Sequence, residues 1–79
     1  MDKCMIISPE ALEFVQDDYQ DNVWYNGDEP IGPIEELAHY WDEFVLDCNI
    51  WGRIVPADLT PEIYHKVWTE IYNHRTGGN

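Results

Sequence analysis

Basic residues are scarce in this chain. Lys and Arg together number 4 among 79 residues, against 16 Asp and Glu, so the formal net charge is −12 at pH 7. A small soluble domain usually carries a net charge of about 2–8 in magnitude. Direct binding to nucleic acid or to an anionic membrane needs clustered Lys and Arg. The scarcity therefore rules out direct nucleic-acid binding and argues against binding to a membrane surface.

Cysteines and long hydrophobic runs are also few. Cys4 and Cys48 are too few for a disulfide framework, so we expect two buried thiols, with a single bridge as the alternative. The first apolar run covers only residues 4–7, which is too short for a signal peptide. No stretch approaches the ~20 apolar residues of a membrane span. We therefore expect a cytoplasmic protein, which would be the host cytoplasm for a phage-encoded chain.

The motifs of catalysis and metal binding are missing from the sequence. It has no Gly-rich phosphate loop, no zinc-binding His-Glu-x-x-His and no Ser–His–Asp or Cys–His pattern. His39 lies near Asp42 and Glu43 but shares its helix face with no second His. The acidic run at residues 17–22 lacks the glycine of a calcium loop. We expect no enzymatic activity, no metal and no cofactor.

The chain does contain enough apolar and aromatic residues to fold. Hydrophobic residues make up 44% of it, and 4 are Trp. Ser8 and Thr60 each precede a proline, which is typical of a helix N-cap followed by proline at the first helical position. Three helices are predicted, followed by a frayed tail: residues 9–20 with an extension to 25, residues 33–51, residues 61–72, and the tail 73–79.

Apolar residues recur at helical spacing and define the expected core. They are Leu12, Val15, Tyr19 and Val23, then Ile34, Leu37, Ala38, Trp41, Phe44, Val45 and Cys48, and finally Ile63, Val67 and Ile71. We predict a mainly α, compact three-helix domain over residues 1–79. Residues 4–7 and 53–55 are candidates for a minimal two-stranded β edge.

A second stripe, Tyr64, Trp68 and Tyr72, lies beside the third apolar stripe. In one interpretation Trp68 completes the core and the tyrosine hydroxyls stay in water. In the other, the stripe binds a partner or a second copy of the chain as a homodimer, because Tyr and Trp are favoured interface anchors. Trp24, Tyr25 and Trp51 leave the same two interpretations open.

The acidic residues are confined to one part of the chain. Residues 4–52 contain 12 acidic side chains and no Lys or Arg, whereas residues 53–79 contain three of each sign. Spacing predicts one stripe on the first helix, the outer face of the second helix, and two acids in the connector between them. The predicted partner-binding residues are Glu10, Glu13, Asp17, Asp18, Asp21, Asp28, Glu29, Glu35, Glu36, Asp42, Glu43 and Asp47.

Such an arrangement destabilises the helices, because like charges one turn apart repel by roughly a few tenths of a kcal/mol per pair. Carboxylates one turn apart are about 5–6 Å from each other, a spacing on the scale of nucleic-acid phosphates. We therefore expect these carboxylates to bind a nucleic-acid-binding protein or complex in place of its polynucleotide. A merely solubilising role is the alternative.

Two segments carry a resemblance to a known family. IEELA at residues 34–38, and VPADL at residues 55–59 leading into EIYHKVW at residues 62–68, are similar to the C-terminal part of ArdA-type antirestriction proteins. The chain also resembles small acidic phage- or plasmid-encoded inhibitors of bacterial defence, including anti-CRISPR proteins. The resemblance implies a DNA mimic that blocks a restriction or CRISPR effector without catalysis. The competing hypothesis is an antitoxin or adaptor that binds through Tyr64, Trp68 and Tyr72.

Overall fold

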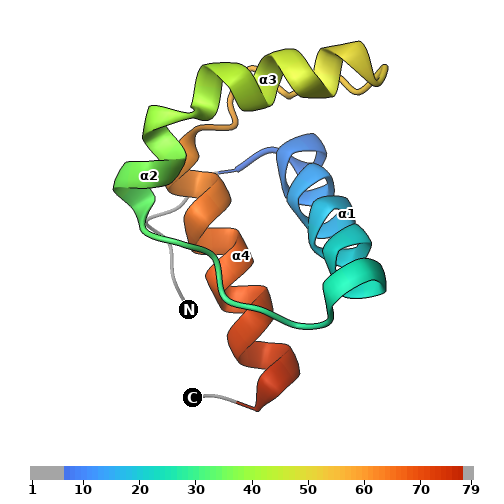
Figure 1. Cartoon of the computed structure of the whole chain (residues 1–79), viewed down its shortest axis with the longest axis vertical. Coiled ribbons are helices and arrows are strands. Elements are labelled where there is room, and N and C mark those ends of the chain that lie inside the picture. Colours follow the sequence, from blue (N-terminus) through green and yellow to red (C-terminus); the bar gives the residue numbers. More distant parts are fainter. Residues whose placement is uncertain (1–6, 78–79) are drawn as a thin grey trace.

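The computed structural model describes residues 7–77. Four helices follow one another along the chain: α1 (Pro9–Asn26), α2 (Ile34–His39), α3 (Trp41–Ile50) and α4 (Pro61–Thr76). α4 packs against both α1 and α2, and α3 extends from α2 across the top of the molecule (Figure 1). The mainly α prediction is confirmed.

The predicted two-stranded β edge is wrong for the residues that the structure describes. Residues 53–55 form no strand, and residues 7–77 contain no strand at all. Residues 4–6, which make up most of the other candidate piece, lie outside the described residues, as does Cys4. Cys48 is a buried free thiol.

The helix starts follow from the capping residues. The Oγ of Ser8 accepts a hydrogen bond from the backbone N–H of Ala11 at 3.1 Å, and the Oγ1 of Thr60 accepts one from that of Ile63 at 3.2 Å. α1 runs to Asn26, which matches the longer of the two predicted extents. α4 continues to Thr76, so the prediction that the tail frays from residue 73 is wrong for residues 73–76.

The second predicted helix is two helices that meet at Tyr40. This residue has φ −101° and ψ 12°, which takes the backbone out of α-helical geometry although no glycine or proline lies near it. Residues on both sides of the break contact α4. On one side of the break α2 packs against α4, and on the other the rings of Trp41 and Phe44 contact the ring of Tyr64, with centroids 5.7 and 5.4 Å away.

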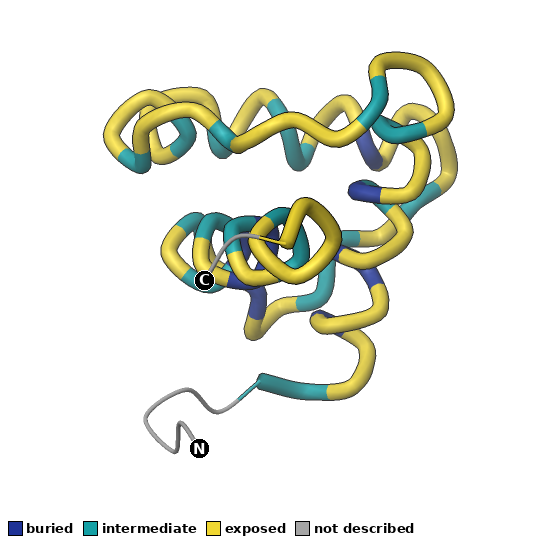
Figure 2. The backbone as a smooth tube through the Cα atoms, turned by 90° about the horizontal axis from the view of Figure 1, so that it is seen from below, coloured by how far each residue is buried: buried dark blue, intermediate teal, exposed yellow. Residues whose placement is uncertain are grey.

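Few positions are fully buried, and they lie mainly where α1 faces α4 (Figure 2). The buried residues are Ala11, Phe14, Val15, Tyr19, Cys48, Leu59, Tyr64, Val67 and Trp68. Leu12, which we expected in the core, is 36% exposed, and Ala38 is exposed as well. The inner face of α1 is therefore centred on Ala11 and Val15.

The aromatic stripe of the last helix belongs to the core. Tyr64 and Trp68 are buried, so the interpretation of these two residues as a partner or homodimer surface is wrong. Trp68 completes the core, as the other interpretation expected, and its Nε1–H donates to the carbonyl of Glu29 at 3.0 Å. Tyr72 is half-buried.

Among the helices of residues 7–77, none has the length and hydrophobicity that a membrane span requires.

Candidate functional site

Asp18, one of the predicted partner-binding acids, is part of the interior. Its side chain is 11% exposed and pairs with the guanidinium of Arg53. Its Oδ2 accepts a hydrogen bond from the hydroxyl of Tyr64 at 2.9 Å, although that hydroxyl was expected in water. Asp18 follows Phe14 by four residues and Val15 by three, so it shares their helix face. The prediction that Asp18 belongs to the exposed stripe is therefore wrong.

The contact of Asp18 with Tyr64 is shielded from solvent. Burial, together with the nearby charge of Asp18 and its hydrogen bond, raises the pKa of the Tyr64 hydroxyl well above its ordinary value. Burial lowers the pKa of the Arg53 guanidinium, but the hydrogen bond and charge of Asp18 more than offset this, so that pKa is raised. Arg53 is therefore held as a cation against Asp18.

Asp28 also makes internal contacts, at the surface rather than in the core. Its Oδ1 accepts hydrogen bonds from the hydroxyl of Tyr19 and from Nε of Arg75, both at 2.7 Å. The hydrogen bond from Arg75, and then that from Tyr19, hold the pKa of Asp28 below its ordinary range. Burial and the Asp28 contact raise the pKa of Tyr19 to about 12. These contacts tie the connector after α1 to the end of α4.

The described basic side chains therefore all have acidic neighbours within the fold. Arg53 pairs with Asp18, Arg75 pairs with Asp28, and Nζ of Lys66 lies 3.7 Å from Glu70. The other predicted partner-binding acids are exposed and form no ion pair within residues 7–77; they are Glu10, Glu13, Asp17, Asp21, Glu29, Glu35, Glu36, Asp42, Glu43 and Asp47.

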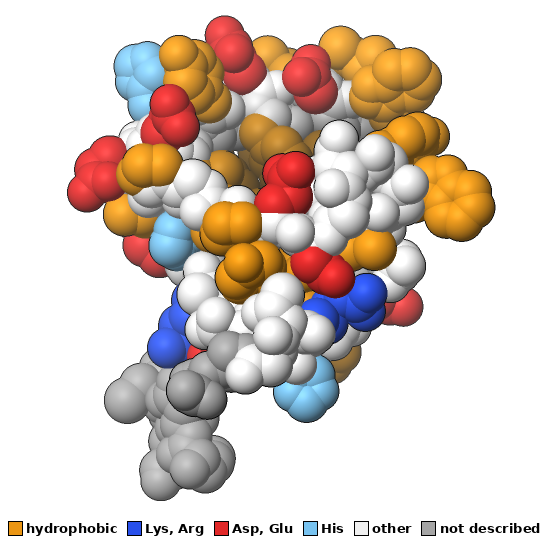
Figure 3. All heavy atoms as spheres, turned by 60° about the horizontal axis from the view of Figure 1, so that its bottom comes forward, with side chains coloured by type: hydrophobic (Ala, Val, Ile, Leu, Met, Phe, Trp, Pro, Cys, Tyr) orange, Lys and Arg blue, Asp and Glu red, His pale blue; other side chains and the backbone are white. Residues whose placement is uncertain are grey.

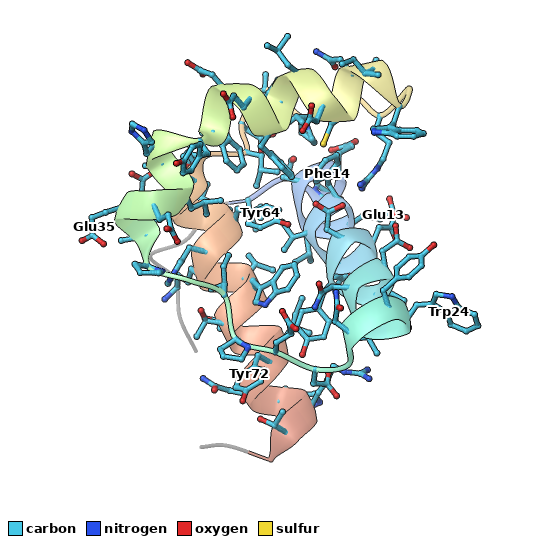
Figure 4. The ribbon with its side chains drawn as sticks, viewed as in Figure 1. Glu13, Phe14, Trp24, Glu35, Tyr64 and Tyr72 are labelled. Atoms are coloured by element: carbon cyan, nitrogen blue, oxygen red, sulfur yellow. The ribbon has the colours of Figure 1, made fainter. Side chains whose placement is uncertain are left out.

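These exposed acids do not form one continuous stripe. Glu13 lies on α1, and Glu35 projects from α2 on the other side of α4 (Figure 4). Figure 3 shows that carboxylates are dispersed among hydrophobic side chains over one face of the molecule, where basic side chains are scarce. The acids of the first two predicted helices therefore present separate surfaces to a partner.

One side is continuous across two helices. A hollow of about 250 Å³ is lined by Glu10, Glu13 and Asp17 of α1, and an adjoining hollow of about 500 Å³ by Asp21 of α1 and Asp47 of α3. Arg53 lines both hollows, so they meet at this residue. We call these five acids, Glu10, Glu13, Asp17, Asp21 and Asp47, the α1–α3 acidic face.

A glycine turn after α3 sets this geometry. Gly52 has φ +79°, the left-handed region that favours glycine. The N–H of Gly52 donates to the carbonyl of Asn49 at 3.0 Å, and the N–H of Arg53 donates to that of Cys48 at 2.8 Å. This pair of bonds is the Schellman C-cap. It reverses the chain directly after Trp51 and brings Arg53 back to Asp18.

Exposed aromatic residues lie at the ends of α1 and α3, and two of them line the α1–α3 acidic face. Trp24, Tyr25 and Trp51 are 80%, 79% and 81% exposed, and Tyr25 and Trp51 line the larger hollow. The sequence left their role open, and the available signal was their position at helix ends, outside the core stripes. Ile54, which is 82% exposed, lines the smaller hollow. The surface is therefore both acidic and apolar.

The described residues contain no group of three or more His, Cys, Asp or Glu that could hold a metal ion.

Comparisons of this chain with protein families, with curated proteins and with solved structures found no match. The interpretation of the α1–α3 acidic face therefore rests on its own chemistry.

Proposed function

We propose that the protein is a non-catalytic inhibitor of a host defence nuclease complex, of the CRISPR or restriction type. It binds the cationic surface that this complex uses for nucleic acid, and it does so by acidic mimicry. One observation carries the proposal: the described basic side chains contact acids within the fold, while ten of the predicted partner-binding acids are exposed and form no ion pair within residues 7–77.

The acids of α1 suit this role because they are held on a rigid element. Glu10, Glu13, Asp17 and Asp21 follow one another at spacings of three and four residues, so they lie along one side of the helix. A cationic groove meets this row without any need to order it first. The net charge of −12 also steers a cationic partner toward the molecule and makes binding weaken as salt rises.

The positions of the exposed acids favour one side of the molecule as the binding surface. A groove that holds a polynucleotide contacts one face at a time, and Glu35 lies on a different side from Glu13. The α1–α3 acidic face is the side on which exposed acids from two helices adjoin. The acids of α2 and of the start of α3 contribute through the overall field.

The alternative function is an interaction module such as an antitoxin or adaptor. Its predicted anchors Tyr64 and Trp68 are buried, so this alternative now depends on the exposed rings of Trp24, Tyr25 and Trp51. Such a module would bind mainly by apolar contact, and its affinity would change little with salt.

Two matched variants test the proposal. The first combines Glu10→Gln, Glu13→Gln, Asp17→Asn and Asp21→Asn; the second combines Glu35→Gln, Glu36→Gln, Asp42→Asn and Glu43→Gln. Both remove the same charge from exposed positions. The readout is competition with a DNA duplex for a purified CRISPR or restriction effector complex, measured across a salt series.

We expect the first variant to lose inhibition and the second to keep most of it, with wild-type inhibition falling steeply as salt rises. Equal losses in the two variants would contradict the assignment to the α1–α3 acidic face. Inhibition that stays constant across the salt series would contradict the electrostatic mechanism and favour the interaction module.

A further inference from the structure

The chain shows within its own fold how it binds an arginine. The guanidinium of Arg53 pairs with the carboxylate of Asp18, and its Cζ lies 4.3 Å from the centroid of the Phe14 ring. A carboxylate thus neutralises the charge while the face of an aromatic ring covers the planar group. Arginine favours this combination because its guanidinium is flat, weakly hydrated and able to stack.

The second described arginine has the same kind of setting. Nε of Arg75 donates to Asp28 at 2.7 Å, and its Cζ lies 5.8 Å from the centroid of the Tyr19 ring. A carboxylate beside an aromatic ring is therefore the arrangement that receives both described arginines of this molecule.

The larger hollow of the α1–α3 acidic face offers the same pair of groups at the surface. Asp21 and Asp47 supply carboxylates, and Tyr25 and Trp51 supply rings that are about four-fifths exposed. Arg53 is the one basic residue among those that line it, and Asp18 already neutralises that charge. With about 500 Å³, the hollow has room for a further side chain.

We propose that this hollow, which we call the arginine groove, receives an arginine from a basic segment of the protein partner. The guanidinium would pair with Asp21 or Asp47 and stack on Trp51 or Tyr25. The inference rests on the proposed function, since both require a cationic partner. It adds that the partner is recognised through arginine and not through positive charge alone.

Charge complementarity decides the occupant. A second copy of this chain would bring another net charge of −12 against the same acids, so self-association through the exposed rings is opposed. A basic segment would instead be attracted electrostatically to these acids, and it would also cover the apolar surfaces of Tyr25 and Trp51. Lysine satisfies the charge but lacks a planar group that stacks on a ring.

Two peptides probe the groove directly: a short peptide of alternating arginine and glycine, and its counterpart with lysine in place of arginine. Their binding to the full chain is measured by titration calorimetry at low salt and at about 150 mM salt. The variants are Trp51→Ala, in the groove, and Trp24→Ala, which is equally exposed but does not line it.

We expect the arginine peptide to bind more tightly than the lysine peptide. Trp51→Ala should weaken arginine-peptide binding by about 2- to 5-fold, the range of a cation–π contact at an exposed ring, and weaken lysine-peptide binding less, because only the planar guanidinium also stacks on the ring. Trp24→Ala should leave both affinities unchanged. Circular dichroism spectra that match the wild type show that each variant is folded.

Each other outcome has a defined meaning. Equal, salt-sensitive binding of the two peptides overturns the arginine inference and leaves the proposed function standing. Equal losses in Trp51→Ala and Trp24→Ala overturn the assignment to the groove. Absence of salt-sensitive binding by either peptide overturns the inference and contradicts the electrostatic mechanism of the proposed function as well.

Discussion

Carboxylates on the inner and outer sides of α1 have different roles. Asp18 faces inward, where Arg53 and the hydroxyl of Tyr64 occupy its oxygens. Asp17, its neighbour in sequence, is exposed and forms no ion pair within residues 7–77. One step along the helix turns a side chain by about 100°, and this turn separates a residue that stabilises the fold from one that is available to a partner.

The comparison shows how a chain with so few basic residues can fold and still present a negative surface. The guanidiniums of Arg53 and Arg75 neutralise Asp18, beside the α1–α4 core, and Asp28, in the connector after α1. Neutralising these positions removes repulsion where the helices must meet. The exposed acids that form no ion pair remain available to a partner. Folding and the proposed binding therefore depend on different acidic residues.

The largest expected difference between the two sides lies in stability. Asp18→Ala leaves the Arg53 guanidinium and the Tyr64 hydroxyl without their acceptor, so we expect it to reduce the free energy of unfolding by about 2–3 kcal/mol. Asp17→Ala removes an exposed carboxylate, so its effect should stay within about 0.5 kcal/mol. Urea unfolding followed by circular dichroism measures both.

Tyr64→Phe sharpens this test, because it removes only the hydroxyl that donates to Asp18. It should destabilise the fold less than Asp18→Ala, and combining the two should cost less than the sum of their separate effects. Strict additivity would contradict the view that Asp18, Arg53 and Tyr64 act as one network.

A smaller effect is expected at the turn that brings the two sides together. Gly52→Ala places a Cβ on a residue at φ +79°, which costs about 1–2 kcal/mol for an L-residue and strains the return of Arg53 toward Asp18. Gly32→Ala is the matched control, since that position does not require a positive φ and its nearest atom to a new Cβ is a flexible Glu36 oxygen at 3.4 Å. The thermal unfolding midpoint of each variant is the measurement, and equal shifts would show that the Schellman turn has no special role.

Much of this fold could be predicted from local signals, because the determinants are local. Ser8 and Thr60 act as caps through their own side chains, and the prolines that follow them need no tertiary context. The break at Tyr40 could not be predicted, because no glycine or proline marks it in the sequence.

For the candidate site too, local patterns predicted some features and missed others. The exposure of Glu13 and Asp17 follows from helix periodicity. The burial of Asp18 was missed because the expected core face included Leu12 and was centred too far from Phe14. The pairing of Asp18 with Arg53 joins residues that are 35 positions apart, which no local pattern reveals.

The smallest expected effect concerns how folding stability changes with pH. Asp28 should contribute to this change, and its neighbour Glu29 should not. The folded-state pKa of Asp28 lies below the ordinary value of 3.8, because it accepts hydrogen bonds from Arg75 and Tyr19. Asp28 therefore contributes stability that is present above pH 3.8 and is lost as the pH falls through the lowered folded-state pKa. Asp28→Asn should reduce the loss of stability between about pH 6 and about pH 3.

Glu29→Gln is the matched control, because it removes an adjacent exposed carboxylate whose side chain makes no hydrogen bond among the described residues. Urea midpoints recorded across this pH range for the wild type and both variants give the comparison. If Glu29→Gln flattened the profile as much as Asp28→Asn, general repulsion among the acids would explain the pH dependence, and the distinction between neutralised and unopposed carboxylates would fail at this position. A profile altered only by Asp28→Asn would extend that distinction from the core to the surface, where the same Arg75 contact also holds the connector against the end of α4.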